Sequence, residues 1–181
     1  MAYPTVAAPY GLRPVKLLSG VPYVGTTRQY SIASGYATDI FYGDAVKLVT
    51  GGTVERDTFD AAMTPIGVFL GCSYTDPSTG QTTFNQYYPA STAADDIMAY
   101  VASDPFLVMQ MQSDEALTQD DLGKNVAVVQ TAGSTAIGTS KNAIDGSTAN
   151  TTNTLPLKII DFVEGPDSAI GDAKTDAATK S

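Results

Sequence analysis

The sequence contains no histidine and no tryptophan, and it has a single cysteine, Cys72, among its 181 residues. Without histidine the chain lacks the usual general base, the commonest metal ligand and the middle member of a Ser-His-Asp triad. One cysteine cannot form an internal disulfide, and it excludes the multi-cysteine clusters of zinc and iron–sulfur sites. The sequence therefore predicts a protein that is not an enzyme and that holds no metal and no cofactor.

Basic residues are also scarce. The chain has 10 Lys and Arg against 19 Asp and Glu, a formal net charge of −9 and an isoelectric point near 4.2. Nucleic-acid affinity comes mainly from basic side chains that neutralise phosphates, and anionic membranes attract basic segments in the same way. We therefore expect neither a nucleic acid nor a membrane as partner.

Long hydrophobic runs are missing as well. No apolar stretch approaches the roughly 18 residues that a membrane-spanning helix needs. Pro4, Pro9 and Pro14 interrupt the first eighteen residues, which also lack the charged start and apolar run of a secretory signal. We expect the protein to be made and kept in a cytoplasm until whatever contains it leaves.

Residues 1–28 are rich in proline and tyrosine, with leucines and valines between them. Proline fixes φ and pushes the preceding residue towards an extended geometry. The segment is therefore predicted to be an extended N-terminal arm rather than a helix. Its apolar content is too high for a freely solvated tail. The arm either folds back over its own domain or docks on a neighbouring subunit, and both interpretations stay open.

Residues 29–165 alternate apolar and polar side chains with the period of two that is typical of half-buried strands. The predicted strands are 29–33, 45–49, 53–56, 65–72, 82–88, 97–102, 106–112, 125–130 and 155–163. Gly51-Gly52 marks a hairpin turn between the second and third strands, because glycine accepts positive φ. The only helical signal is a short turn over 117–124, with Thr118 as N-cap and Gly123 as terminator. The pattern predicts an all-β domain.

Two later segments are less regular. Residues 131–154 are small and polar, and they are predicted to form a long surface loop or to carry an irregular strand around 135–144. Residues 166–181 contain too few apolar side chains to bury, so we expect a polar C-terminal tail that is mobile or ordered by a partner.

Several residue groups could suggest chemistry, but their spacing argues against it. The acidic pairs lack the spacing of a calcium-binding loop, which favours solvated turn charges; they are Asp95-Asp96, Asp114-Glu115 and Asp120-Asp121. Ser140-Lys141 lies in a predicted loop, where sequence neighbours rarely point into one pocket. Cys72 stands in the apolar "GVFLGCSY" and is expected to be a small buried residue.

The densest aromatic cluster is "FNQYYPAS", which contains Phe84, Tyr87 and Tyr88. Tyrosine suits contacts that are half exposed to water, so we favour interface or rim packing for this cluster. A strip of aromatic rings that stacks on carbohydrate is the alternative.

One stretch carries a family resemblance: "FYGDAVKLV…GGTVERD…TPIGVFLGCSYTDPSTGQTTFNQYYPA". It resembles the head decoration, or capsid cement, proteins of tailed bacteriophages. Gly43-Asp44 opens a strand, "GGTV" forms a turn, and "TPIGVFLG" is a core strand. The opening "MAYPTVAAPYGLRPV", and later "LTQDDLGKNVAVV" with "LPLKIIDFV", are similar to virion structural proteins of phages. The likeness covers roughly residues 1–165.

The resemblance implies a small antiparallel barrel, a β-tulip or a jelly-roll-like domain, with Asp44 at a turn rather than in a site. It also leads us to expect a closing strand after "FVEGPDS", which "GDAKTDAATKS" does not supply. The implied protein is a homotrimer that assembles in the host cytoplasm and binds the phage major capsid protein on the capsid exterior, stabilising the head. The residues that we expect to contact the capsid lie in the arm: Tyr3, Pro4, Tyr10, Leu12, Arg13 and Pro14.

Two other functions remain open at this point. The first is a tail-associated or fibre-associated β module that binds glycans on the host surface. The second is a carboxylate-dependent hydrolase on a jelly roll, which would need a close pair of carboxylates buried in a cleft.

Overall fold

A computed structural model describes residues 7–59, 63–165 and 168–180 of the chain. Within these ranges the chain forms twelve β-strands and one short 3-10 turn, η1 (Gln119–Asp121), and it contains no α-helix. The ladders between these strands are antiparallel. The prediction of an all-β fold is confirmed.

Six strands form a first sheet, sheet A, in the order β1-β8-β12-β11-β9-β10. Their bounds are β1 (Arg13–Leu17), β8 (Leu107–Gln112), β12 (Asp176–Lys180), β11 (Leu157–Phe162), β9 (Asn125–Val129) and β10 (Ala143–Asn150). β1 and β12, the first and the last of the described strands, therefore lie on either side of β8.

The other six strands form sheet B. Five of them follow the order β2-β7-β5-β3-β4, and β6 pairs with the second half of β5. Their bounds are β2 (Arg28–Ser31), β7 (Met98–Ala102), β5 (Gly67–Thr75), β3 (Ala45–Leu48), β4 (Val54–Arg56) and β6 (Thr82–Asn85).

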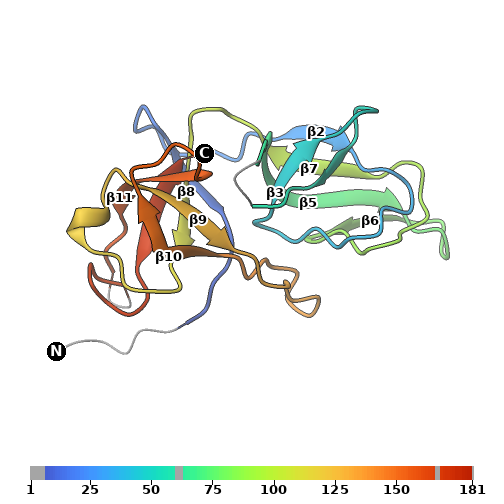
Figure 1. The fold of residues 1–181 in the computed structure, drawn as a ribbon. Coiled ribbons are helices and arrows are strands. Elements are labelled where there is room, and N and C mark those ends of the chain that lie inside the picture. The colour runs from blue at the N-terminus through green and yellow to red at the C-terminus, as the bar shows by residue number, and fades with distance from the viewer. Residues whose placement is uncertain (1–6, 60–62, 166–167, 181) are drawn as a thin grey trace.

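Sheet B is inserted into sheet A. All six of its strands lie between β1 and β8 in the sequence, so the chain leaves sheet A after Leu17 and returns to it at Leu107. Figure 1 shows the two sheets as two lobes that lie side by side.

Neither sheet closes into a barrel. Sheet A curls until the end of β8 reaches β10, but only a single parallel bridge, Ser113 to Ile144, joins them there. The N–H of Asp114 donates to the carbonyl of Ile144 at 2.9 Å beside this bridge. The closed barrel among our sequence-based expectations is therefore not what the chain forms.

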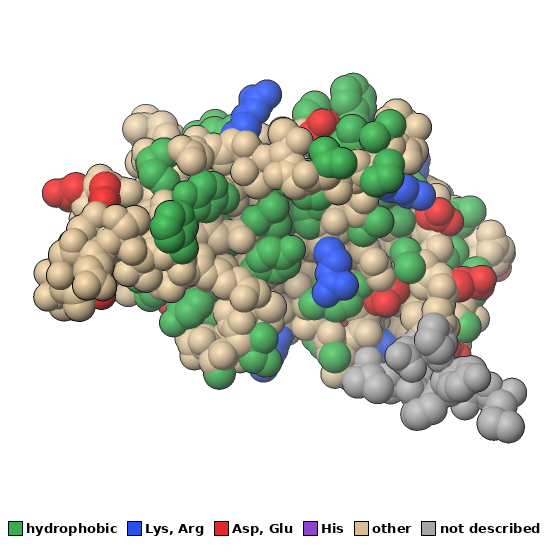
Figure 2. Space-filling view, turned by 180° about the vertical axis from the view of Figure 1, so that it is seen from behind, with side chains coloured by type: hydrophobic (Ala, Val, Ile, Leu, Met, Phe, Trp, Pro, Cys, Tyr) green, Lys and Arg blue, Asp and Glu red, His purple; other side chains and the backbone are tan. Residues whose placement is uncertain are grey.

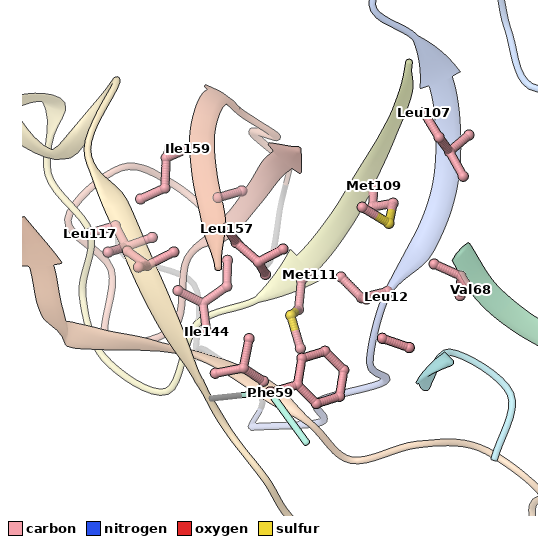
Figure 3. Packing of buried hydrophobic residues seen from close by; sticks show 14 of the residues in the cluster. Leu12, Phe59, Val68, Leu107, Met109, Met111, Leu117, Ile144, Leu157 and Ile159 are labelled. Atoms are coloured by element: carbon pink, nitrogen blue, oxygen red, sulfur yellow. The ribbon is translucent and has the colours of Figure 1, made fainter. Parts of the chain in front are cut away.

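Each sheet has its own hydrophobic cluster. The cluster of sheet A includes Met111 of β8 and Ile159 of β11, and it also receives Val68 of β5 from sheet B. Figure 3 shows Leu12 beside Met111, with Val68 on its other side. The second cluster lies on sheet B and includes Phe69, Tyr88 and Val101. Because the first cluster contains residues of both sheets, the two lobes share buried contacts.

The nine strands predicted from the sequence are all present, with ends that differ by a few residues. Gly51 and Gly52 have φ of 131° and 79°, and the N–H of Val49 donates to the carbonyl of Thr53 at 3.0 Å across this turn. The predicted hairpin between β3 and β4 is therefore confirmed. The helical signal over 117–124 becomes the single turn η1, and Gly123 follows it with a φ of 83°.

The arm is part of the fold from residue 12 onward. Leu12 is 1% exposed in the cluster of sheet A, and β1 pairs with β8 from Arg13 to Leu17. Prolines are tolerated in an edge strand, because one side of that strand needs no ladder of hydrogen bonds. Of the two interpretations of the arm, folding back over its own domain describes residues 12–17.

The prediction of a mobile tail after Gly165 is wrong for residues 176–180. These residues form β12, which pairs with β8 on one side and β11 on the other. Its central residues, Ala177, Ala178 and Thr179, are buried. The small size of these side chains hid the strand from a search for large apolar residues. The chain thus supplies the strand after "FVEGPDS" that the resemblance led us to expect.

The segment 131–154 combines the two predicted alternatives. Residues 131–142 form a loop with a few isolated bridges, and β10 follows from Ala143 to Asn150.

Candidate functional site

The strongest concentration of buried polar groups centres on Asp44, just before β3. The N–H of Asp44 donates to the carbonyl of Phe41 at 2.9 Å, so the residue lies in a turn, as the resemblance implied. Its side chain, however, is 0% exposed. The resemblance predicts the turn at Asp44, but nothing in the sequence predicts the burial of its side chain.

Both carboxylate oxygens of Asp44 have several partners. Oδ1 accepts hydrogen bonds from the Ser140 hydroxyl at 2.7 Å and from the Asn142 side-chain amide at 2.9 Å. Oδ2 accepts the N–H of Phe41 at 3.0 Å and lies 3.2 Å from Nε of Arg56. That nitrogen is buried and makes no hydrogen bond, so its contact with Asp44 is an ion pair without hydrogen-bond alignment.

Burial raises the pKa of Asp44, because removal from water disfavours its charged form. The charge of Arg56 and the hydrogen bonds from Phe41 and Ser140 act in the opposite direction. A carboxylate with no access to solvent cannot reach a substrate. We therefore interpret this cluster as a structural junction between chain segments, and we call it the Asp44 junction.

The junction joins the two lobes. Arg56 ends β4 of sheet B, whereas Ser140 and Asn142 lie directly before β10 of sheet A. The N–H of Asn142 also donates to the Ser140 hydroxyl oxygen at 3.2 Å, which fixes the short segment between them. Asp44 is therefore held by both lobes at once.

Two glycines allow the backbones to meet at this point. The N–H of Leu12 donates to the carbonyl of Gly43 at 2.8 Å. Gly43 has a φ of 92°, and a Cβ atom added there would lie 2.8 Å from the carbonyl oxygen of Tyr10. Gly11 has a φ of 73°, and a Cβ atom there would lie 2.6 Å from the carbonyl oxygen of Gly43. A larger residue at either position would have to push the two segments apart.

The loop before β10 adds further contacts between the lobes. The N–H of Tyr42 donates to the carbonyl of Gly138 at 3.1 Å, and the N–H of Ser140 donates to the carbonyl of Tyr42 at 2.9 Å. Gly133 lies against the ring of Phe41, where a Cβ atom would come within 2.3 Å of a ring carbon. The polar loop predicted from the sequence is thus packed against sheet B.

Asp57 is a second buried carboxylate, at 1% exposure. It accepts the N–H of Thr58 at 2.8 Å and of Thr64 at 3.0 Å, and Nζ of Lys47 lies 3.8 Å away. The hydrogen-bond donors and the cation that contact Asp57 are different residues from those that contact Asp44.

The expected capsid-contact residues occupy different environments. Tyr3 and Pro4 lie outside the described residues. Leu12 is buried in the core, and Pro14 is half-buried in β1, opposite Met109. The structure therefore gives Leu12 a place in the core rather than on the surface.

Tyr10 and Arg13 lie together on the outside of sheet A. The hydroxyl of Tyr10 donates to Oδ1 of Asp176 at 3.2 Å, and the guanidinium carbon of Arg13 lies 4.4 Å from the centre of the Tyr10 ring. Burial and the nearby charge of Asp176 raise the pKa of Tyr10 above its ordinary value. Arg13 is exposed and remains accessible to a partner.

The aromatic cluster divides into packed and exposed rings. Tyr88 is fully buried, and its hydroxyl donates to the carbonyl of Tyr36 at 3.0 Å. Tyr87 stacks on Phe41 with ring centres 5.5 Å apart. Phe84, by contrast, is 72% exposed on β6. Packing therefore accounts for both tyrosines but not for Phe84.

The remaining candidate groups serve local structure. Asp96 accepts hydrogen bonds from the N–H and hydroxyl of Thr75, which lower its pKa. Asp121 likewise accepts the N–H and hydroxyl of Thr118 at 2.8 and 2.9 Å. Cys72 is 1% exposed, as its apolar surroundings predicted. Across the described residues, no group of three or more acidic or cysteine side chains is placed to hold a metal ion.

One surface of the protein is apolar and exposed. Val15, Leu18, Val21 and Val24 lie on β1 and the loop after it, and Phe106 lies directly before β8. Figure 2 shows hydrophobic side chains gathering along the upper edge of the molecule, over the lobe of sheet A. The apolar content of residues 1–28 is evident in the sequence, but the sequence does not show which of these side chains stay exposed.

Comparison with known proteins does not identify the chain. No family model, no curated protein and no solved structure matches it. Within the described ranges, no helix has the length and apolar character that crossing a membrane requires.

Proposed function

We propose that this chain is a structural virion protein of a tailed bacteriophage. It binds the outer surface of the capsid and cements neighbouring major capsid protein subunits, which stiffens the head. Each copy contacts two or more capsid subunits, and contacts within a homotrimer add avidity. The protein assembles in the host cytoplasm and resides on the capsid exterior.

The observation that carries this proposal is the way in which the base of the N-terminal arm is anchored. The N–H of Ala8 donates to Oε1 of Gln112 at 2.9 Å, and Tyr10 binds Asp176. Residues 7–11 belong to no strand, and the chain enters the core only at Leu12. An extended segment held at its base loses less conformational entropy when its outer part docks on a neighbour.

Within the arm, we assign the capsid contact to Tyr3, Pro4 and Arg13. Tyr10 positions the side chain of Arg13, which lies over its ring. Leu12 holds the arm in the core.

The family resemblance supports the same proposal. Its motif includes Gly43-Asp44, which forms the junction between the two lobes. We also propose, on the basis of this resemblance, that the fold is related to a β-tulip or a jelly roll. The acidic composition suits an outer-shell protein, because an acidic surface repels the genome.

The proposal is tested by adding purified protein to phage heads that lack it and measuring the number of bound copies per head. Deleting residues 1–6 removes Tyr3 and Pro4 but leaves β1 and Leu12 in place. We expect this deletion to reduce occupancy strongly. Phe84→Glu, a change on the exposed face of β6, is the control and should bind normally. Equal occupancy by the deletion variant and the complete chain would contradict the role of the arm, and no binding by the complete chain would contradict the function.

Phe84 favours a second candidate function. An aromatic ring that is 72% exposed can stack on a sugar ring, as expected for a tail or fibre module that binds host glycans. Binding of the purified protein to immobilised host polysaccharide, lost in Phe84→Ala, would support this function. Labelled protein that coats whole heads would count against it.

A further inference from the structure

The exposed apolar side chains on β1, on the loop after it and directly before β8 form a group, which we call the hairpin surface. It consists of Val15, Leu18, Val21, Val24 and Phe106. The loop that carries it is ordered by hydrogen bonds, because the N–H of Leu17 donates to the carbonyl of Val21 at 2.8 Å and that of Leu18 to Phe106 at 2.8 Å. Leu17, Leu18 and Phe106 also line a shallow pocket. Val24 is 85% exposed, the highest value among these five side chains.

The charge around this surface differs from that of the rest of the protein. The first 38 residues contain Arg13, Lys16 and Arg28 but no acidic residue, whereas the rest of the chain holds the other 7 basic residues and all 19 acidic ones. Lys180 adds a fourth cation, with Nζ 5.9 Å from the centre of the Phe106 ring. Three carboxylates lie beside these cations: Asp104 accepts the N–H of Phe106, Asp161 pairs with Lys16 at 3.5 Å, and Asp176 interacts with the charge of Arg13. Four cations against three carboxylates leave a local excess of one positive charge, on a protein of net charge −9.

The opposite character is found around η1, at the end of the sheet A lobe that points away from sheet B (Figure 1). We call this region the acidic end. Its carboxylates are Asp114, Glu115, Asp120, Asp121 and Asp172. They belong to one region, because the N–H of Gly171 donates to the carbonyl of Leu117 at 2.8 Å and Lys174 donates to the carbonyl of Asp114.

The acidic end also presents apolar side chains. Leu122 is 43% exposed directly after η1, and Ala116 and Ala173 are exposed on the two segments that carry the other carboxylates of this region. Its two lysines are engaged within the region, Lys124 with Asp121 at 2.9 Å and Lys174 with the carbonyl of Asp114. An apolar centre with a carboxylate rim therefore lies on the same chain as an apolar surface with a basic rim.

We propose that the hairpin surface of one copy binds the acidic end of a second copy of this chain. Leu18, Val24 and Phe106 pack around Leu122, and the basic rim of one copy faces the carboxylates of the other. Complementary rims direct the encounter and fix the register, while the apolar centre supplies the affinity. Because the two surfaces differ, the contact is head-to-tail and leads to a closed ring or an open chain rather than to a two-fold dimer.

This inference rests on the proposed function, which includes self-association, and it names the two surfaces through which the copies bind each other. It is tested without capsids, by sedimentation velocity of the complete chain over a concentration series. We expect concentration-dependent association that weakens when NaCl is raised from about 50 to about 500 mM, because exposed charges are screened. Leu18→Glu and Leu122→Lys, each on one side of the contact, should raise the dissociation constant about tenfold or more.

Two further variants keep the test decisive. Phe84→Glu introduces the same charge on an exposed aromatic position of sheet B and should associate like the unchanged protein. If Leu18→Glu does not fold, Val24→Glu replaces it as the test of the hairpin surface. Val24 is 85% exposed, so a charged side chain at this position should not disturb the core. A protein that stays monomeric at every concentration, or association that Leu18→Glu and Leu122→Lys leave unchanged, would overturn the inference.

The capsid assay separates this inference from the function itself. If the protein is monomeric in solution and Leu18→Glu nevertheless lowers occupancy on heads, the hairpin surface binds the capsid and not a second copy. That outcome overturns the inference and leaves the proposed function standing. If the protein self-associates through these surfaces but does not bind heads, the inference stands and the proposed function fails.

Discussion

Asp44 carries a carboxylate that only protein groups can stabilise, because its side chain is fully buried. Water is replaced by the Ser140 hydroxyl, the Asn142 amide and the N–H of Phe41, with Arg56 as counter-ion. Removing one member of such a set lowers the stability of the fold strongly, because the remaining donors stay buried without an acceptor.

Asp44→Ala is therefore expected to lower the free energy of unfolding by about 3–5 kcal/mol. Arg56 would keep a half-buried charge without its partner, and three hydrogen-bond donors would lose their acceptor. Urea unfolding measures the change. Ser140→Ala removes a single donor and should cost only about 1 kcal/mol. In the double variant Asp44→Ala/Arg56→Met, part of the loss should be regained, because no unpaired charge remains. A double variant less stable than Asp44→Ala would contradict this account.

The pH dependence of stability follows from the direction of the Asp44 shift. Burial raises the pKa of Asp44 in the folded protein, so the folded state binds this proton more tightly than the unfolded state does. The contribution of this proton to stability is fully present below the unfolded pKa and is lost as the pH rises through the folded pKa. The unchanged protein should therefore lose part of its advantage in free energy of unfolding over Asp44→Ala as the pH rises from below the unfolded pKa to above the folded pKa. Urea titrations at a series of pH values measure this difference. A difference that widens instead would show that the folded pKa is lowered.

At the scale of elements, β12 shows how a strand can be central without being hydrophobic in composition. It pairs with β8 and β11, and its buried positions are filled by Ala177, Ala178 and Thr179. Small side chains suit a strand that is covered closely on both faces, because little space remains for larger ones.

Ala178→Asp tests the burial of β12. A carboxylate at this buried position would have no partner, so we expect a loss of about 3 kcal/mol or more in the free energy of unfolding. Ala173→Asp, in the exposed turn before the strand, is the matched control and should stay within about 0.5 kcal/mol of the unchanged protein. Equal stability of the two variants would mean that β12 is not packed in solution.

The sequence predicts the elements whose pattern is local. Alternation identifies strands such as β3 and β9, and Gly51-Gly52 identifies the turn between β3 and β4. β1 escaped prediction because prolines mark an arm as readily as an edge strand. The Asp44 junction escaped it for a different reason, since Ser140 and Asn142 lie 96 and 98 positions away in the chain. No local pattern reports contacts at that separation.

At the scale of the whole molecule, the two lobes share one junction and part of one core. Ala45, Val68 and Ala102 of sheet B belong to the cluster of sheet A, and Gly43 meets the arm where the lobes join. Shared buried contacts of this kind couple the stability of two units. We therefore expect a single cooperative unfolding transition for the complete chain.

Gly43→Ala should weaken this coupling. A Cβ atom at Gly43 would lie 2.8 Å from the carbonyl oxygen of Tyr10, in addition to the cost of about 1–2 kcal/mol for a positive φ. Differential scanning calorimetry should show a broadened or split transition. At Gly52, φ is also positive but nothing lies within 4 Å of an added Cβ, so Gly52→Ala should lower the melting temperature without splitting the peak. Identical calorimetric profiles for the two variants would argue against a junction at Gly43.

The insertion of sheet B between β1 and β8 also sets an order in time. Sheet B is complete once residue 102 has left the ribosome, and it can fold while the rest of the chain is still being made. β1 is made before sheet B but must wait for β8, and the place between β8 and β11 stays empty until β12, the last of the described strands, arrives. During that interval β8 and β11 each expose the edge that β12 will cover, and such unpaired edges are prone to wrong pairing. Slow translation or termination after residue 165 would therefore leave a fragment without the strand between β8 and β11, and we expect that fragment to aggregate.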